Sequence, residues 1–204
     1  MVQPLNDLRE SPSQTAGPYV HIGCTPNFSG IEIYGGDLGT AMKTGPVKGQ
    51  EITIRGIVYD GMGAAMRDAL VEIWQADATG LFPSAGEKRG KADPNFTGWG
   101  RSPGDMNTGE FTFETVKPGQ VPFVDGRLQA PHVSFWIVAR GINIGLQTRM
   151  YFADEADANA VDPVLTRIEH QSRVSTLLAH PEGDGTYRFD IHLQGPQETI
   201  FFDI

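Results

Sequence analysis

The chain has 204 residues, of which 39% are hydrophobic and 20% are charged, and its formal net charge at pH 7 is −9. This composition fits one or two ordinary globular domains, and the length is sufficient for a sizeable core. Because its 16 basic residues are scattered and outnumbered by 25 acidic ones, we expect neither a nucleic-acid partner nor a membrane partner.

Seven short segments have the composition of β-strands, since each is rich in β-branched and aromatic residues and is bounded by glycine, proline or aspartate. In the first of them Ile52, Ile54 and Val58 recur roughly at the period of two that a half-buried strand shows. In chain order the predicted strands are 51–60, 69–77, 109–116, 132–139, 147–153, 185–194 and 198–204. Strands of this number and spacing predict an all-β protein built as a β-sandwich.

One segment between the fifth and sixth predicted strands has helical periodicity instead. Its apolar residues at helical spacing are Leu165, Ile168, Val174, Leu177 and Leu178. Asp162 is placed to cap a helix that begins with Pro163, and Pro181 and Gly183 follow its end. We therefore predict one helix in the C-terminal third, about Pro163 to Ala179, laid against the sandwich.

Two connections, 23–50 and 80–108, are long for a compact domain, and loops of that length usually carry function or form interfaces. No internal repeat or low-complexity linker divides the chain. We predict a single domain overall, in which residues 1–50 form an N-terminal arm that belongs to an interface and a pocket. Residues 51–204 form the β-sandwich core.

The sequence carries no visible targeting signal. Residues 1–15 lack the basic and apolar regions of a secretory signal, and no apolar run approaches the roughly 20 residues of a spanning helix. Cys24 is the single cysteine, so an intrachain disulfide is impossible and a reducing compartment is the simpler interpretation. We expect a cytoplasmic protein.

Six motifs occur in an order and at spacings that match a known family. They are SPSQTAGPYVHIG (11–23), LVEIWQADATG (70–80), DPNFTGWGR (93–101), FTFETVKPG (111–119), APHVSFWIVARG (130–141) and TRMYF (148–152). Together they resemble the intradiol ring-cleavage dioxygenases over nearly the whole chain. The resemblance implies the β-sandwich fold of that family and an oxidoreductase function.

The resemblance also implies where a metal would be bound. The family holds non-haem Fe(III) through two tyrosines and two histidines, because phenolate oxygens stabilise this hard ion and imidazoles complete the shell. The two tyrosine positions are Phe82 and Val121 in this chain, and the His-x-His pair has become His132 followed by Ser134. An arginine that catalytic members carry just before that pair aligns with Gln129.

Three of the four ligand positions have therefore lost their donor atoms, and a single histidine cannot hold ferric iron in a defined site. The resemblance implies that this chain supplies no metal ligand and no catalytic residue. Fe(III) is then expected in a homologous iron-binding beta chain, with which this chain would form a hetero-oligomer. We interpret His132 as a hydrogen-bonded core histidine, with metal binding as the minor alternative.

The resemblance assigns substrate binding to the N-terminal arm, where Thr15, Gly17, Pro18 and Tyr19 match positions that border the substrate pocket. The Gly17-Pro18 pair forces a turn, the glycine allows close backbone approach, and Tyr19 offers an aromatic face and a hydroxyl. The alternative is an arm that merely crosses an interface between chains.

Arg140 matches the family position that binds a carboxylate on the substrate ring, and a guanidinium is the natural two-pronged partner of a carboxylate. By strand parity it shares a face with His132, Ser134 and Trp136. An ordinary ion-pairing residue at the end of a strand is the alternative.

The reaction that the resemblance implies is the cleavage of protocatechuate between its two ring hydroxyls, with insertion of both atoms of O2. The product would be 3-carboxy-cis,cis-muconate, in the β-ketoadipate pathway of aromatic catabolism. Two other hypotheses stay open at this point. One is a binding or scaffold sandwich without catalysis, and the other is a self-sufficient enzyme that holds iron through tyrosines such as Tyr151 and Tyr187.

Overall fold

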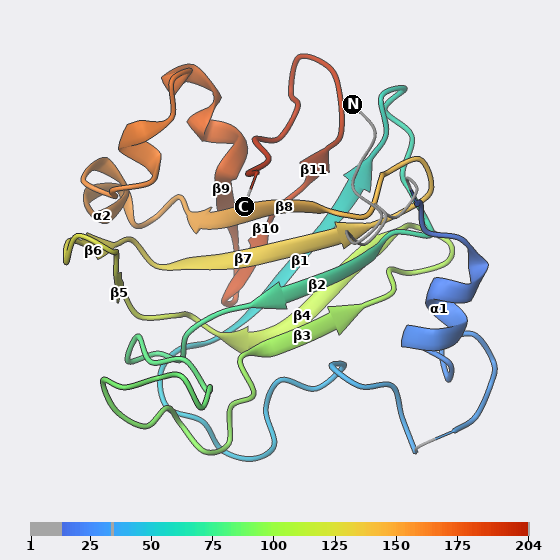
Figure 1. Cartoon of the computed structure of the whole chain (residues 1–204), viewed down its shortest axis with the longest axis horizontal. Helices are drawn as coiled ribbons and strands as arrows, with labels where there is room; N and C mark the ends of the chain where they lie inside the picture. Colours follow the sequence, from blue (N-terminus) through green and yellow to red (C-terminus); the bar gives the residue numbers. More distant parts are fainter. Residues whose placement is uncertain (1–13, 34, 204) are drawn as a thin grey trace, which may run out of the picture.

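Two β-layers formed by one folded sheet make up the body of the molecule (Figure 1). The computed structural model describes residues 14–33 and 35–203, so the first part of the predicted arm lies outside it. One layer contains, in spatial order, β3 (Trp99–Ser102), β2 (Leu70–Trp74), β7 (His132–Val138) and β8 (Leu146–Phe152). The other contains β4 (Glu110–Val116), β1 (Glu51–Tyr59), β10 (Thr186–Arg188) and β11 (Ile191–His192). The prediction of an all-β sandwich is confirmed.

The strand β9 (Leu178–Gly183) connects the two layers. Its first two residues pair in parallel with β8, and its later residues pair antiparallel with β10. On the opposite side, the backbone N–H of Thr112 in β4 donates to the hydroxyl of Ser102 in β3, at 3.3 Å. The sheet is therefore nearly closed, and a separate hairpin, β5 (Val121–Pro122) with β6 (Leu128–Gln129), lies before β7.

Aromatic side chains fill the space between the layers. Successive side chains of a strand point to opposite faces, and in β7 this buries Val133, Phe135 and Ile137 while Trp136 stays partly exposed. Four phenylalanine rings contact one another with centroids 5.2 to 6.4 Å apart. They come from β4, from β7 and from the residue after β10, and are Phe111, Phe113, Phe135 and Phe189.

The predicted helix from Pro163 to Ala179 is not one continuous element. The segment forms two short 3-10 helices, η1 (Leu165–Arg167) and η2 (Gln171–Leu177), and then enters β9. The side-chain amide of Gln171 donates to the carbonyls of Leu165 and Ile168, at 3.0 and 2.6 Å. These carbonyls would bond to backbone N–H groups in a continuous helix, so the amide stabilises the break.

The helical periodicity of this segment nevertheless marks a buried face. Leu165 and Leu177 form a second core cluster with Ala130 and Tyr151, on which Ile168 and Val174 also pack. Asp162 caps the turn before η1 rather than a continuous helix: its Oδ1 accepts the N–H groups of Val164 and Leu165, both at 2.8 Å, and the N-cap residue of η1 is Val164.

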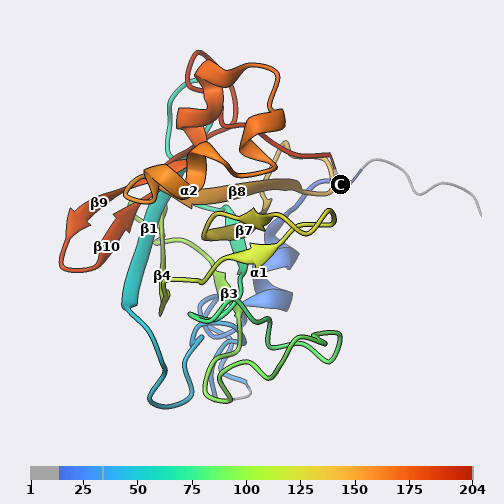
Figure 2. The same ribbon diagram turned by 90° about the vertical axis from the view of Figure 1, so that its left-hand side faces the viewer.

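Several elements were not predicted from the sequence, among them the short strands β5 and β6 and the connecting strand β9. The helix α1 (Pro18–Cys24) begins at the Gly17-Pro18 turn, the helix α2 (Ala156–Ala160) lies in an acidic connection, and β3 lies inside the predicted loop 80–108. Conversely, the described residues of the last predicted strand, 198–203, adopt no strand, and Ile204 lies outside the described residues. Figure 2 shows α2 and the helical turns that follow it at one end of the layers and the long loops at the other. No helix in the described part is long and apolar enough to cross a bilayer.

Candidate functional site

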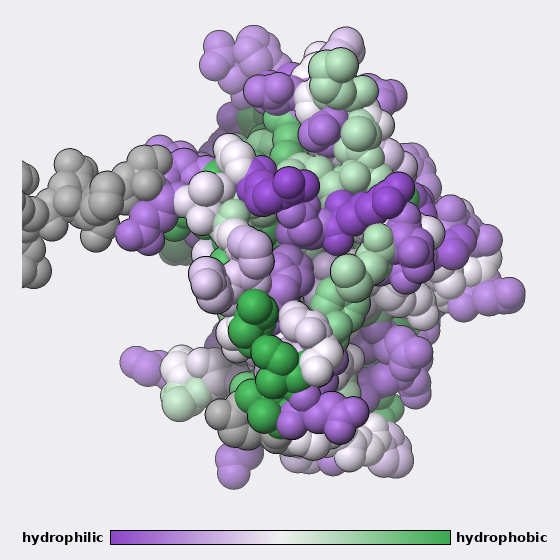
Figure 3. Space-filling model, turned by 90° about the vertical axis from the view of Figure 1, so that its right-hand side faces the viewer, coloured by the Kyte–Doolittle hydropathy of each residue, from purple (hydrophilic) through white to green (hydrophobic). Residues whose placement is uncertain are grey.

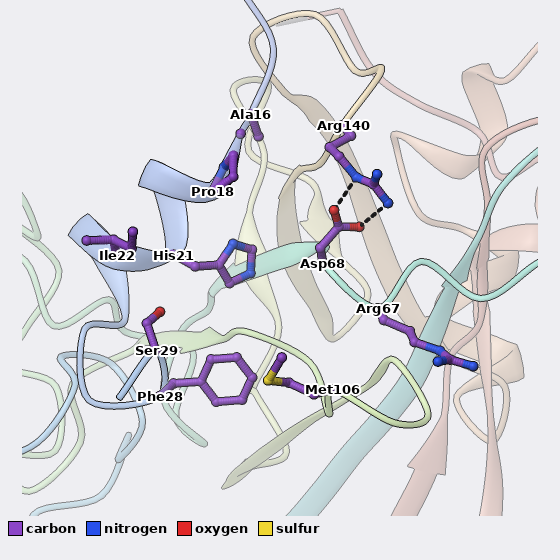
Figure 4. Close-up of a pocket in the computed structure, with 11 residues that line it drawn as sticks. Ala16, Pro18, His21, Ile22, Phe28, Ser29, Arg67, Asp68, Met106 and Arg140 are labelled. Carbon is purple, nitrogen blue, oxygen red and sulfur yellow. Dashed lines mark hydrogen bonds and ion pairs between the residues drawn. The ribbon is translucent and has the colours of Figure 1, made fainter. Parts of the chain in front are cut away.

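A cavity of about 470 Å³ lies beside α1, at the ends of several strands (Figure 4). Much of its wall is apolar and comes from Pro18, Ile22, Phe28 and Met106. Charged and polar side chains of α1 and of the loops next to β2 and β7 complete it, namely His21, Arg67, Asp68 and Arg140. The size and the mixture of an apolar wall with a few polar groups are typical of a small-molecule site, for which the common range is roughly 300–1,000 Å³.

The cavity brings together Gly17, Pro18 and Arg140, three of the residues that the sequence selected. Tyr19 is 84% exposed and is not among the residues that line it. Thr15 does not line it either, but it lies against the turn that carries Arg140. The structure thus separates the five candidates into three wall residues, one supporting residue and one side chain that projects from the surface.

Thr15 fixes the arm to the turn after β7. Its hydroxyl donates to the carbonyl of Ala139 at 3.2 Å and accepts the N–H of Gly141 at 2.9 Å. The N–H of Ile144 also donates to the carbonyl of Gln14, at 2.7 Å. These bonds hold both neighbours of Arg140 and place that residue next to the start of α1.

Arg140 forms an ion pair with Asp68 on the cavity wall (Figure 4). Its Nε contacts Oδ2 of the carboxylate closely, and its Nη2 lies 3.5 Å from Oδ1. A guanidinium has five N–H donors, so this pairing uses one edge and leaves the Nη1–Nη2 edge for another acceptor. The Arg140 side chain is 74% exposed, which keeps that second edge accessible.

The apolar side of the cavity is held by two polar anchors. The guanidinium of Arg101 donates to the carbonyl of Cys24 at 2.9 Å, which ties the end of α1 to β3. The carboxylate of Asp37 accepts the backbone N–H groups of Asn27 and Phe28, both at 2.8 Å. Although desolvation opposes it, these bonds and the Asn27 side chain keep the pKa of Asp37 below its usual value.

The sequence did not single out His21, Phe28, Asp68 or Met106 as functional residues. They come from separate segments of the chain and share no periodicity or spacing. The only available signal was that His21 lies inside the first motif, four residues after Gly17.

A second region contains the positions that the family resemblance assigns to iron. Ser134 pairs in register with Trp74 on one side and with Arg149 on the other, and Phe82 stacks on Trp74 with ring centroids 5.9 Å apart. Val121 pairs with Gln129 in the β5–β6 hairpin. The guanidinium of Arg149 donates to the side-chain oxygen of Gln129 at 2.8 Å. These former ligand positions thus gather near one side-chain cation.

His132 has the environment of a structural histidine. Its Nδ1 is 2.8 Å from the carbonyl of Ala130, and its ring lies against Tyr151 with centroids 5.6 Å apart. Burial lowers the pKa of His132 to about 4, and the positive charge of Arg149 acts in the same direction. Burial and the carboxylate of Asp162 raise the pKa of Tyr151, so its hydroxyl stays protonated.

The residues around Arg149 do not fit a ferric ion. Phenylalanine and valine offer no donor atom, so Phe82 and Val121 leave two of the four ligand positions without a metal-binding group. Within residues 14–33 and 35–203, no group of three or more histidine, cysteine, aspartate or glutamate side chains is arranged to hold a metal ion.

Tyr151 and Tyr187 do not form a replacement site either. They belong to different core clusters, and each hydroxyl faces its own carboxylate: Asp162 at 3.5 Å for Tyr151, and Asp154 at 2.8 Å for Tyr187. Tyr151 and Tyr187 are therefore not the convergent pair that the hypothesis of a self-sufficient enzyme requires.

Comparisons with known proteins agree with the fold and the motifs. A family model described as "Dioxygenase" matches residues 25–195. The chain is 44% identical to the protocatechuate 3,4-dioxygenase alpha chain of Pseudomonas putida, over 98% of this chain and 99% of that protein. It is 32% identical to the protocatechuate 3,4-dioxygenase beta chain of Burkholderia cepacia, over 78% of this chain and 71% of that one.

Among solved structures, the dioxygenase domain of a dioxygenase carbohydrate-binding protein fusion from Streptomyces sp. SirexAA-E has the same fold. It superimposes with a TM-score of 0.56 at 24% identity, over 79% of this chain and 88% of that one. The chain belongs to the family of the intradiol ring-cleavage dioxygenases.

Proposed function

We propose that the chain is the alpha subunit of a protocatechuate 3,4-dioxygenase and works with a homologous, iron-bearing beta chain. The observation that carries the proposal is its 44% identity, over almost its whole length, to a protein of that name and size. The loss of the metal donors at Phe82, Val121 and Ser134 supports the assignment of Fe(III) to the partner. The similarity to a beta chain supports a partner of the same fold.

The cavity beside α1 supports a role in substrate binding. Protocatechuate is a flat ring with a carboxylate at one end, and the cavity offers a largely apolar wall with a guanidinium at its edge. In this proposal Arg140 binds the carboxylate through the donors that Asp68 leaves unused. Gly17 and Pro18 form the part of the wall that lies against the ring. Thr15 positions Arg140 through the backbone on either side of it.

The surface around α1 supports a partner chain. Figure 3 shows apolar side chains gathered on the face that carries α1, and exposed residues there include Tyr19, Ile22, Phe28, Ile31 and Ile33. Exposed apolar patches of this kind mark protein interaction sites more often than plain solvent-facing surface. We therefore propose that the beta chain covers this face and that Tyr19 contacts it or the shared pocket.

The reaction in this proposal is the cleavage of protocatechuate between its hydroxyls by O2, giving 3-carboxy-cis,cis-muconate for the β-ketoadipate pathway. The ferric iron of the partner supplies the chemistry that activates the catecholate toward O2. The residues of this chain bind the carboxylate, orient the ring and exclude water from one side of the pocket. Fixing the substrate in this way contributes to the rate through orientation.

The test is to purify the chain alone and with a co-expressed beta chain, and to measure iron content and ring cleavage. We expect the lone chain to be colourless, iron-free and inactive, and the complex to hold one iron per pair of chains and to consume O2. Stoichiometric ferric iron with a tyrosinate charge-transfer colour in the lone chain would overturn the proposal. An iron-loaded complex that does not cleave protocatechuate would favour the binding or scaffold hypothesis.

A further inference from the structure

The cavity contains one buried polar atom whose hydrogen-bonding capacity is not used. Nε2 of His21 is buried and has no hydrogen-bond partner in the part of the chain that the structure describes. Buried polar atoms without partners are uncommon in folded proteins, and each needs an explanation. His132 is a useful contrast, because its Nδ1 is satisfied by the carbonyl of Ala130.

The position of the His21 ring is fixed by its surroundings. The carbonyl of His21 accepts both the N–H and the hydroxyl of Thr25, at 2.7 and 3.1 Å, so the backbone at the end of α1 is held. The ring lies 6.4 Å from the ring of Phe28, with their planes tilted by 40°. Figure 4 shows it pointing from α1 toward the space between Phe28 and the Arg140–Asp68 pair.

The geometry points to His21 as a second residue that binds the substrate carboxylate: we propose that its Nε2–H donates to one oxygen of a ring carboxylate whose other oxygen meets Arg140. This inference rests on the proposed function and goes beyond it, because it assigns a specificity role to a residue outside the set selected from the sequence. With both residues in place, the site would bind aromatic acids more tightly than the corresponding phenols that lack a carboxylate. A ligand there would satisfy an atom that the folded chain leaves without a partner.

The atom involved allows a sharp test in the complete complex with the beta chain. Glutamine places its amide nitrogen close to the position of Nε2, whereas asparagine places it close to that of Nδ1. We would measure KM and kcat with protocatechuate for His21→Gln, His21→Asn and His21→Phe, and the dissociation constant of catechol, which lacks the carboxylate. His180→Phe, at an exposed position of β9, is the matched control.

We expect His21→Phe and His21→Asn to raise KM about tenfold, which corresponds to the loss of one hydrogen bond to a charged group. We expect kcat to stay nearly unchanged. His21→Gln should restore most of the affinity, and the affinity for catechol should not change in any variant. Iron content and melting temperature, measured for every variant, separate these effects from misfolding.

The proposal is overturned if asparagine and glutamine give the same KM, or if catechol binding weakens as much as protocatechuate binding. If His21→Phe does not fold, the comparison of glutamine with asparagine still decides the question. Failure of the proposed function looks different, because the wild-type complex itself would then cleave no protocatechuate.

Discussion

Arg149 donates a 2.8 Å hydrogen bond to the side-chain oxygen of Gln129, in the region where the metal-ligand positions of the family gather. The region thus contains a fixed positive charge that belongs to the protein itself. The nearby histidine is kept neutral and the nearby tyrosine protonated, which is the protonation pattern of a structural polar network. The positions that the resemblance assigns to iron ligands thus lie beside a structural polar network that includes Arg149, Gln129, His132 and Tyr151.

The first prediction concerns the charge of Arg149. Arg149→Met removes the nearby positive charge, so we expect the pKa of His132 to rise from about 4 while burial keeps it below its ordinary 6.5. An NMR titration of the histidine C–H signals would measure it, with Arg55→Met, a residue of β1 paired with Glu182, as the control. An unchanged His132 pKa in Arg149→Met would show that the guanidinium does not act on this ring.

The second prediction concerns the stability of the fold in acid. The pKa of His132 is lower in the folded chain than the ordinary 6.5, so the unfolded chain binds more protons between pH 6.5 and about 4. The contribution of His132 to the free energy of unfolding is fully present above pH 6.5. It is lost as the pH falls toward 4, at up to about 1.4 kcal/mol per pH unit. In urea unfolding at several pH values, the free energy of unfolding should fall less steeply with decreasing pH in His132→Asn than in the wild type. Equal slopes for the two proteins would exclude His132 as the source.

The third prediction concerns Asp162, which is fully buried. Its carboxylate accepts the N–H groups of Ala130, Val164 and Leu165, at 2.7 to 2.8 Å. Asp162→Ala leaves these donors without a partner, so we expect the free energy of unfolding to fall by about 3 kcal/mol or more. Asp162→Asn keeps one oxygen acceptor and should lose less. Denaturant unfolding at pH 7 measures both, and a loss below about 1 kcal/mol in the alanine variant would contradict this account.

The fourth prediction concerns the carboxylate anchor. In the complex with the beta chain, Arg140→Ala should raise KM for protocatechuate about tenfold or more, because a charge-assisted bond to the substrate is lost. Arg140→Lys keeps the charge but not the two-pronged edge, so it should restore only part of the affinity. Arg127→Ala, an exposed arginine paired with Asp125, is the control. A change of less than twofold in Arg140→Ala would remove Arg140 from the substrate site.

The sequence predicted what depends on local patterns and on shared motifs. Alternation in 51–60 predicted β1, because burial on one face imposes a period of two, and the β-branched and aromatic composition of 132–139 predicted β7. The same reasoning failed for residues 163–179, where a real buried face is built from two broken turns that Gln171 stabilises through its side chain. Periodicity predicts which residues are buried, but it does not predict which backbone carbonyls will accept a hydrogen bond from a side chain.

The candidate site was predictable only in part, for a related reason. The motifs pointed to Gly17, Pro18 and Arg140, and these residues line one cavity. His21 and Asp68 were identified only from the structure, since an unpaired ring nitrogen and an ion pair depend on three-dimensional packing. Tyr19 matched the same motif, yet its side chain projects from the surface of the single chain.

The last prediction concerns Thr15, which does not line the cavity and acts through Arg140. Thr15→Val keeps the shape of the side chain but removes the hydroxyl that bonds to Ala139 and Gly141. We expect KM for protocatechuate to rise several-fold with little change in kcat, because the arm and the turn that carries Arg140 are no longer fixed to each other. Thr15→Ser keeps the hydroxyl and should behave as the wild type. The double variant tests this coupling. If adding Thr15→Val to Arg140→Ala raises KM by the same factor as adding it to the wild type, the two effects are additive and Thr15 does not act through Arg140.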